Sequence, residues 1–314
     1  MTDEREALVG LAAEIFAGRT SNEQLAKIEL SESRWDAELW RELAEAGLLG
    51  IALPESVGGA GLGLTELCLL FEQQGKFLAP IPLWETTVAA LVLERAGVGN
   101  DWLERVCAGT ARLSLAVDLG GSDGLVSGPF DALVVVAGDS VSFVEAPTAV
   151  PAETTNHTLA FDVTHDGGVP LDVDATWVRD LVRVSLCAVQ LGVADVGVRE
   201  AAAHLKGREQ FGRSLATFQA TTQQLGDAYC DVQAMRATVG QAVHTLGRRE
   251  VDVACWWATD GAERVQHVVQ HLHGGLGADI TYPVHRRLLW TMRTNALLGG
   301  PSRQLVRLGA ALVN

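Results

Sequence analysis

The stretch LKGREQFGRSLATFQATTQQLGD, residues 205–227, carries the most specific pattern in the chain. Its first half is a glycine-rich turn that holds three chemically distinct side chains, Arg208, Gln210 and Phe211. The group Thr217-Phe218-Gln219 then opens a helix. Backbone N–H groups at a helix start, with an arginine beside them, make a binding place for an anion. The alternative is an ordinary helix–turn–helix in which Thr217 caps the second helix.

A second distinctive segment is QHLHGGLGADITYP, residues 270–283. His271 and His273 flank Gly274-Gly275, and glycines let another backbone or a flat ligand come close. The spacing of the two histidines puts them on different sides of a helix, so we do not expect them to share a metal ion. The alternative for the glycine pair is a simple helix C-cap. A third segment, NALLGGPSRQLVRLGAAL at residues 295–312, predicts a Gly-Gly loop that leads into a helix.

The whole chain divides by pattern into three parts. Residues 1–108 show helical periodicity around a Gly-rich loop at 50–63 and predict an N-terminal helical domain. Residues 109–172 contain short β-branched runs between turn residues and predict a reduced β domain. Residues 173–314 predict a C-terminal helical bundle, so the expected fold is mainly α with a small β domain. The expected helices lie at residues 3–17, 34–47, 65–75, 84–96, 177–205, 217–247, 250–272 and 300–312.

The composition excludes several classes of protein. A net charge of −15 over 314 residues argues against nucleic-acid binding, because phosphate neutralisation needs a basic face. The five cysteines are far apart and include no CxxC pair, so they predict neither a disulfide framework nor a zinc site. The charged start MTDEREALVG does not read as a signal sequence, and no uncharged apolar stretch of about 18 residues is evident. We therefore expect a reduced, cytoplasmic protein without metal or membrane contact.

Taken together, these segments resemble the acyl-CoA dehydrogenase family. LAEAGLLGIALPESVGGAGLGLTELCLLFEQQG at 43–75 is similar to the family's N-terminal helical domain. GREQFGRSLATFQ is similar to its flavin-binding turn, and HLHGGLGADITYPVHR to its later Gly-Gly segment. The resemblance implies helical domains on either side of a β domain, FAD as cofactor, and α,β-dehydrogenation of an acyl-CoA thioester.

In this family a flavin lies across a subunit interface. One subunit's β domain and C-terminal loop hold the isoalloxazine ring, and the neighbouring subunit holds the pyrophosphate and adenine. The resemblance assigns the second role to the following residues of this chain: Arg208, Gln210, Phe211, Phe218, Gln219, His271, Leu272, Gly274 and Gly275. His271 stands where the family usually has Gln, and it keeps a hydrogen-bond donor and acceptor.

The chain departs from the family at the catalytic base. The reaction needs a carboxylate to remove the acidic α-proton of the thioester. Leu298 occupies the position of the usual Glu, and Val182, just ahead of Arg183, occupies the position that a minority of members use. Neither side chain can move a proton. Asp180 is the nearest alternative, but it points about 200° away from residue 182 around the helix.

The β region departs as well. It is short and contains no Trp. Gly120-Gly121-Ser122-Asp123 is the segment most similar to the family's Gly-Ser-Asp loop, and this similarity is weak. The half of the site that holds the flavin ring is therefore degraded, and the half that holds the adenine end is kept.

This split predicts one subunit of a heteromeric enzyme. The chain resembles the short, base-lacking subunit of heterotetrameric (α2β2) acyl-CoA dehydrogenases of actinobacterial sterol breakdown. The implied partners are a longer dehydrogenase subunit with the Glu base, an acyl-CoA substrate, and electron-transfer flavoprotein or a similar acceptor. The resemblance to the enzymes of sterol breakdown suggests that the acyl group is steroid-derived. Two alternatives remain open: a self-sufficient homomeric enzyme with a relocated base, and a scaffold or regulatory subunit without flavin.

Overall fold

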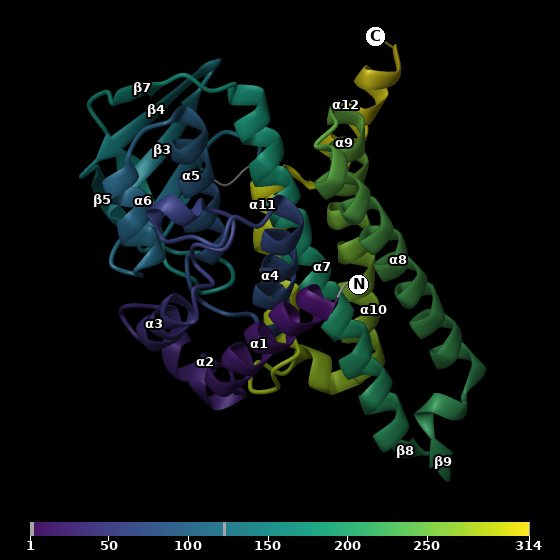
Figure 1. Cartoon of the computed structure of the whole chain (residues 1–314). Coiled ribbons are helices and arrows are strands. Elements are labelled where there is room, and N and C mark those ends of the chain that lie inside the picture. Colours follow the sequence, from purple (N-terminus) through teal and green to yellow (C-terminus); the bar gives the residue numbers. More distant parts are fainter. Residues whose placement is uncertain (1–2, 122–123, 314) are drawn as a thin grey trace.

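The computed structural model describes residues 3–121 and 124–313. Helices precede and follow a β region, so the expected mainly helical fold with a small β part is confirmed (Figure 1). The first helices are α1 (Asp3–Arg19), α2 (Asn22–Glu29), α3 (Ala37–Glu45), η1 (Glu55–Val57), α4 (Leu64–Phe77), α5 (Leu83–Ala96) and α6 (Asn100–Cys107). The later ones are α7 (Ala175–Gly207), η2 (Leu215–Thr217), α8 (Gln219–Thr245), α9 (Arg248–Trp256), η3 (Trp257–Gly261), α10 (Ala262–His273), η4 (Gly274–Ala278), α11 (His285–Leu298) and α12 (Gly300–Val313).

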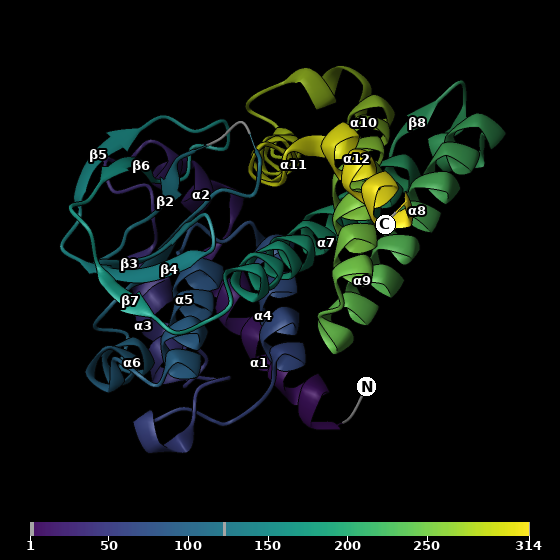
Figure 2. The ribbon, with the colours of Figure 1, turned by 90° about the horizontal axis from the view of Figure 1, so that it is seen from above.

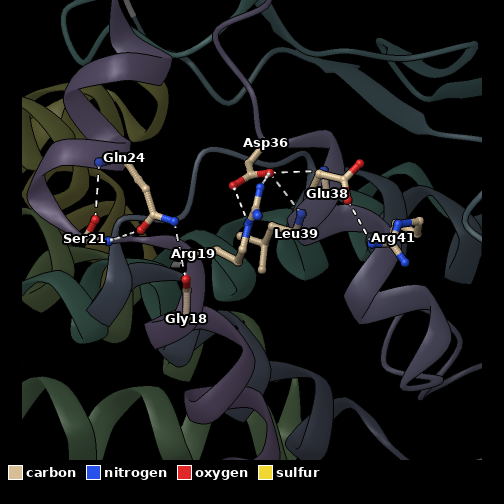
Figure 3. Close-up of polar contacts among 8 residues, drawn as sticks. All are labelled: Gly18, Arg19, Ser21, Gln24, Asp36, Glu38, Leu39 and Arg41. Atoms are coloured by element: carbon tan, nitrogen blue, oxygen red, sulfur yellow. Dashed lines mark hydrogen bonds and ion pairs between the residues drawn. The ribbon is translucent and has the colours of Figure 1, made fainter.

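Local capping fixes where the first short helices begin (Figure 3). At α2, Ser21 and Gln24 form a reciprocal capping box, with side chain to backbone distances of 3.3 and 3.0 Å. At α3, the Asp36 carboxylate accepts from the backbone of Glu38 and Leu39, both at 3.0 Å. Arg19, at the end of α1, pairs with the same carboxylate at 2.9 Å and so ties α1 to α3.

The strands of the β region form two small sheets. They are β1 (Leu113–Val117), β2 (Val126–Ser127), β3 (Ala132–Ala137), β4 (Ser140–Glu145), β5 (Thr148–Ala152), β6 (Ala160–Thr164) and β7 (Val169–Leu171). One sheet has the order β1-β3-β4-β7, with β1 parallel to β3, and the other has the order β2-β6-β5. All these strands lie between α6 and α7, inside the limits of 109 and 172 expected for the β domain; the exact division into domains stays a prediction.

α7 is the central helix of the molecule. The Asp174 side chain starts it by accepting from the Thr176 backbone at 2.8 Å. Seen from above, α7 runs between α4 and the β region on one side and α8, α9 and α12 on the other (Figure 2). By length and composition α7 would be able to cross a membrane, which sequence inspection did not anticipate, but 94% of its most apolar window is buried inside the protein. It is therefore a buried helix of the protein core.

Two glycines allow α4 and α7 to pack backbone against backbone. A Cβ atom at Gly75 would lie 1.9 Å from the carbonyl oxygen of Val189, and one at Gly192 would lie 2.0 Å from that of Glu72. These distances are far below any van der Waals contact. The close packing of α4 against α7 therefore requires glycine at positions 75 and 192.

The C-terminal helices differ from the sequence-based expectation in two places. The helix predicted at 250–272 is confirmed as an unbroken run through α9 and α10, but it contains a π-helical turn, Trp257–Gly261, that the sequence did not predict. There the Thr259 hydroxyl bonds back to the carbonyl of Cys255 at 2.8 Å, which loosens the backbone ladder. The helix α11 was not predicted, because most of its buried side chains are polar and so give no apolar period. They are Arg286, Arg287, Thr291, Arg293, Thr294 and the apolar Leu298.

Candidate functional site

The predicted flavin-contacting segment forms a projecting β-hairpin. β8 (Glu209–Gln210) pairs with β9 (Arg213–Ser214), and the turn residues Phe211 and Gly212 both have positive φ, at 55° and 77°. Phe211 is 91% exposed, and Arg208 and Gln210 are exposed as well. In Figure 1 this hairpin stands at the end of the molecule away from the two sheets. The glycine turn therefore holds an aromatic side chain at an exposed tip, where it can contact another molecule.

The start of α8 lies directly behind the hairpin. Phe218 is its N-cap residue and Gln219 its first helical residue, and no side chain among the described residues caps this end. The Thr217 hydroxyl instead donates to the Ser214 carbonyl at 2.7 Å, so the alternative in which Thr217 caps the helix is wrong. Arg213 lies over the Phe218 ring at 4.0 Å. The first N–H groups of α8 therefore remain available to an anion.

The glycine turn of the second segment lies at the end of α10. Gly274 has φ 60° and ψ −133°, a conformation open only to glycine, and a Cβ added to Gly274 or Gly275 would meet nothing within 4 Å. His271 is exposed, whereas the Leu272 side chain is buried in the core. Leu272, one of the predicted cofactor-binding residues, can therefore contact a ligand only through its backbone.

A stacked pair of histidines brings the two segments together. The His204 ring, one turn before Arg208 on α7, stacks on the His273 ring of α10 with centroids 4.5 Å apart. The His204 carbonyl accepts from the Arg208 backbone at 2.9 Å, and His273 directly precedes Gly274. Burial lowers the pKa of His204, and the neighbouring His273 and Arg208 lower it further. The histidine pair thus links the end of α7, where the hairpin begins, to the end of α10, where the glycine turn begins. We call the hairpin, the start of α8 and the glycine turn together the hairpin surface.

Both candidate base positions are buried and apolar. Leu298 is 0% exposed at the end of α11, and its carbonyl accepts a hydrogen bond from the Gln304 amide. Val182 is 2% exposed on α7. The loop at Gly121 closes over this region, since a Cβ there would lie 2.0 Å from the Ala296 carbonyl oxygen. The two positions therefore lack a carboxylate, and both side chains are shielded from bulk water.

Asp180 is engaged elsewhere. Arg183 donates to its carboxylate at 3.0 Å, and burial raises the pKa of Asp180 although Arg183 opposes the shift. Asp180 lines a cavity of about 510 Å³ together with Arg179, Arg248 and Arg307. Val182 instead lines a different cavity, of about 230 Å³. The structure thus places the only nearby carboxylate of α7 on a different face from the base position.

Sequence reasoning missed two buried charged residues, Glu85 of α5 and Arg293 of α11. Both line an inner cavity of about 50 Å³. Burial raises the pKa of Glu85 to about 8, and burial lowers the pKa of Arg293 to about 10. The one signal for Glu85 was an acid inside the otherwise apolar run LWETTVAALVL. Of the segment similar to the family's Gly-Ser-Asp loop, Ser122 and Asp123 lie outside the described residues.

The exposed groups of the hairpin surface fit a flavin dinucleotide. The start of α8 offers backbone N–H groups and Arg208 offers a guanidinium, which together suit a pyrophosphate. The open space at Gly274 and Gly275 leaves room for a flat group against the backbone. No part of this fit requires the chain's own sheets, which lie at the other end of the molecule (Figure 1).

Comparison with known proteins identifies the class. Acyl-CoA dehydrogenase, N-terminal domain, matches residues 2–115, and Acyl-CoA dehydrogenase, C-terminal domain, matches residues 175–312. The chain is 33% identical to acyl-CoA dehydrogenase FadE27 of Mycobacterium tuberculosis (strain ATCC 25618 / H37Rv), over 99% of this chain and 97% of that protein. The chain therefore belongs to the acyl-CoA dehydrogenase family, and is an oxidoreductase of that class.

Two solved structures are similar over nearly the whole chain. One is described as "Tcur3481-Tcur3483 steroid ACAD G363A variant", with 40% identity, a TM-score of 0.93, and coverage of 99% of this chain and 98% of that chain. The other is the ChsE4-ChsE5 complex from Mycobacterium tuberculosis, with 30% identity, a TM-score of 0.90, and coverage of 100% and 98%. Both are complexes of two named components, and the family resemblance expected from the sequence is confirmed.

Proposed function

We propose that this chain is one subunit of a heteromeric FAD-dependent acyl-CoA dehydrogenase. It contributes the adenine and pyrophosphate half of the FAD site, and a longer partner subunit supplies the flavin-ring grip and the Glu base. One observation carries the proposal: the hairpin surface is exposed and lies away from the chain's own sheets, while Leu298 and Val182 are buried and apolar. A cofactor bound there needs a second chain to cover it.

The residues of the hairpin surface have distinct tasks in this proposal. Arg208 and the uncapped start of α8 bind the pyrophosphate, because both present N–H donors to an anion. Phe211 and Phe218, whose rings lie edge to face at 6.2 Å, shield that contact from water. Gly274 and Gly275 admit the adenine end next to the backbone. When bound, FAD supplies a hydride acceptor for the β-carbon of the substrate.

The proposed substrate is an acyl-CoA thioester derived from a steroid. Support comes from the similarity to a steroid acyl-CoA dehydrogenase at 40% identity. Electron-transfer flavoprotein or a similar carrier would reoxidise the flavin. The scaffold alternative is less well supported, because a subunit without flavin would have no need for an uncapped helix start, an exposed arginine and an open glycine turn on one surface.

The test is flavin content in the assembled complex. The chain is co-expressed with a longer dehydrogenase subunit encoded beside it, and bound FAD is measured after purification. Arg208→Ala removes a charged hydrogen bond worth about 1.5–3 kcal/mol, so FAD affinity should fall by at least tenfold. Arg249→Ala, an exposed arginine on α9, is the matched control and should keep full occupancy. Unchanged flavin content in Arg208→Ala would refute the assignment.

A further inference from the structure

The His204–His273 pair connects the two segments of the hairpin surface. Its rings stack with centroids 4.5 Å apart and planes inclined by 30°. The carbonyl of His204 accepts from the backbone N–H of Arg208 at 2.9 Å, and His273 directly precedes Gly274. The pair is therefore linked through the backbone both to the arginine and to the glycine turn that we assign to the cofactor.

His273 is the fixed member of the pair. It is 4% exposed, and its Nδ1 lies 2.7 Å from the carbonyl oxygen of Val269. A carbonyl oxygen can only accept a hydrogen bond, so Nδ1 of His273 carries the proton in this contact. The Tyr282 ring lies on a further side, with its centroid 5.7 Å from that of His273. His204 is only half-buried, so it is the member whose ring can exchange a proton with solvent.

Among the described residues, the groups that shift the pKa of His204 all lower it. Burial has the largest effect, and His273 of α10 and Arg208 at the end of α7 add to it. Four charged residues close by along the chain are not among these groups: Glu200, Lys206, Glu209 and Arg213. An ordinary histidine titrates near pH 6.5, so His204 is mainly uncharged at about pH 7.

The neighbouring charged side chains are engaged with other groups. Glu200, one turn before His204 on α7, pairs with an arginine of α11 at 2.6 Å. Arg213 of β9 lies over the Phe218 ring at 4.0 Å. The η2 turn, which also packs on α7, contains no titratable side chain. Within the described part of the chain, no carboxylate therefore offsets the effect of Arg208 on His204.

An anion bound to Arg208 would reverse this balance. Because the Arg208 guanidinium is close enough to His204 to lower its pKa, a phosphate group bound to that guanidinium is close enough to raise it. A group whose pKa rises when a ligand binds takes up protons as the ligand binds. The same linkage makes the ligand bind more tightly at lower pH.

We propose that His204 is a positioning residue that takes up a proton from solvent when FAD binds, so that cofactor binding tightens as the pH falls. The proton goes to the free nitrogen of the neutral imidazole, and the new positive charge lies beside the pyrophosphate. The stacked His273 ring keeps the His204 ring in place for this contact. The inference rests on the proposed function, because the anion is the pyrophosphate that we assign to Arg208.

The test is isothermal titration of FAD into the assembly with the longer subunit, after its flavin has been removed. In the wild type at about pH 6.5, the binding heat should differ between Pipes and imidazole buffers, because the buffer releases the proton that His204 takes up. FAD should also bind about fivefold more tightly at about pH 6 than at about pH 8, within the limit of tenfold per pH unit for one proton.

His204→Phe keeps a stacked ring that cannot take up a proton. It should bind FAD with no difference between buffers, match the wild type at about pH 8 and bind about fivefold more weakly at about pH 6. If this variant does not assemble, His204→Gln removes the same titration and should behave alike. His244→Gln, at an exposed position near the other end of α8, is the control and should retain the proton uptake. His271→Gln, which changes the exposed histidine of the hairpin surface, should retain it as well.

Two results would overturn the inference: binding heats that do not depend on the buffer in the wild type, or the same proton uptake in His204→Phe as in the wild type. These failures differ from a failure of the proposed function. A wild-type assembly that binds FAD without taking up a proton refutes only the role of His204. An assembly that binds no FAD at any pH refutes the proposed function and this inference together.

Discussion

Arg183 of α7 and Asp252 of α9 form an ion pair in the core, at the wall of the cavity of about 510 Å³. The same guanidinium donates to Asp180 at 3.0 Å and to the Gln304 amide oxygen of α12 at 3.1 Å. One arginine thus joins three helices of the C-terminal bundle. Because the arginine stays charged when a partner is removed, the arrangement is sensitive to the loss of either carboxylate.

Asp252→Ala should therefore destabilise the protein strongly. It leaves the Arg183 charge buried with one carboxylate instead of two, and breaking a buried pair costs about 3–5 kcal/mol. Chemical denaturation followed by circular dichroism measures the loss. The control is Glu45→Ala, which breaks an exposed pair with Arg41 and should leave the midpoint unchanged. A loss no larger than that of the control would mean that the pair contributes little.

The backbone contact between α4 and α7 gives a second prediction. Gly192→Ala would place a Cβ 2.0 Å from the Glu72 carbonyl oxygen, so the helices must separate at a cost of about 1–3 kcal/mol. Gly240, on the exposed side of α8, has nothing within 4 Å of an added Cβ. Gly240→Ala should therefore stabilise the protein by up to about 1 kcal/mol. Thermal melting of the two variants should shift in opposite directions, and a shift in the same direction would contradict the packing argument.

Restoring a carboxylate at the base position should not restore catalysis. Leu298 is fully buried, so Leu298→Glu would place a carboxylate in the core. We expect a loss of about 4 kcal/mol or more in unfolding free energy and no dehydrogenase activity from the isolated chain. Leu30→Glu, at a position 90% exposed, is the control and should melt like the wild type. Turnover by Leu298→Glu would show that the position is open to substrate.

The sequence predicted those structural features that depend on a short stretch of residues. The turn glycines and the Phe-Gln pair marked the hairpin and the start of α8, because positive φ and helix starts leave residue-specific signals. It missed the π turn at Trp257–Gly261, since one extra residue per turn barely alters an apolar period. It could not find Glu85 and Arg293, because their meeting depends on how α5 and α11 pack, and those helices are about 200 residues apart in sequence.

Glu85 should make stability depend on pH. Its pKa rises from 4.5 to about 8 in the folded protein, chiefly through burial, so the folded state holds this proton more tightly than the unfolded chain does. The stabilisation is complete below about pH 4.5 and is lost as pH rises toward about 8, at up to about 1.4 kcal/mol per pH unit. Glu85→Gln should flatten the decline in melting temperature over this window. Glu6→Gln, at an exposed site, should leave the decline as it is.

The composition of the assembly gives the last prediction. In the proposed function, the hairpin surface holds one half of a flavin site, and the base positions of the same chain are occupied by Leu298 and Val182. Two copies of this chain would therefore bring two adenine halves together without a catalytic half. A partner with an intact ring site completes one flavin for each copy of this chain, so we expect an α2β2 tetramer with two FAD. Native mass spectrometry with flavin quantification measures both numbers. Four FAD per tetramer, or a flavin-loaded homotetramer of this chain alone, would show that its small sheets can hold the ring and that the site is not divided between unlike chains.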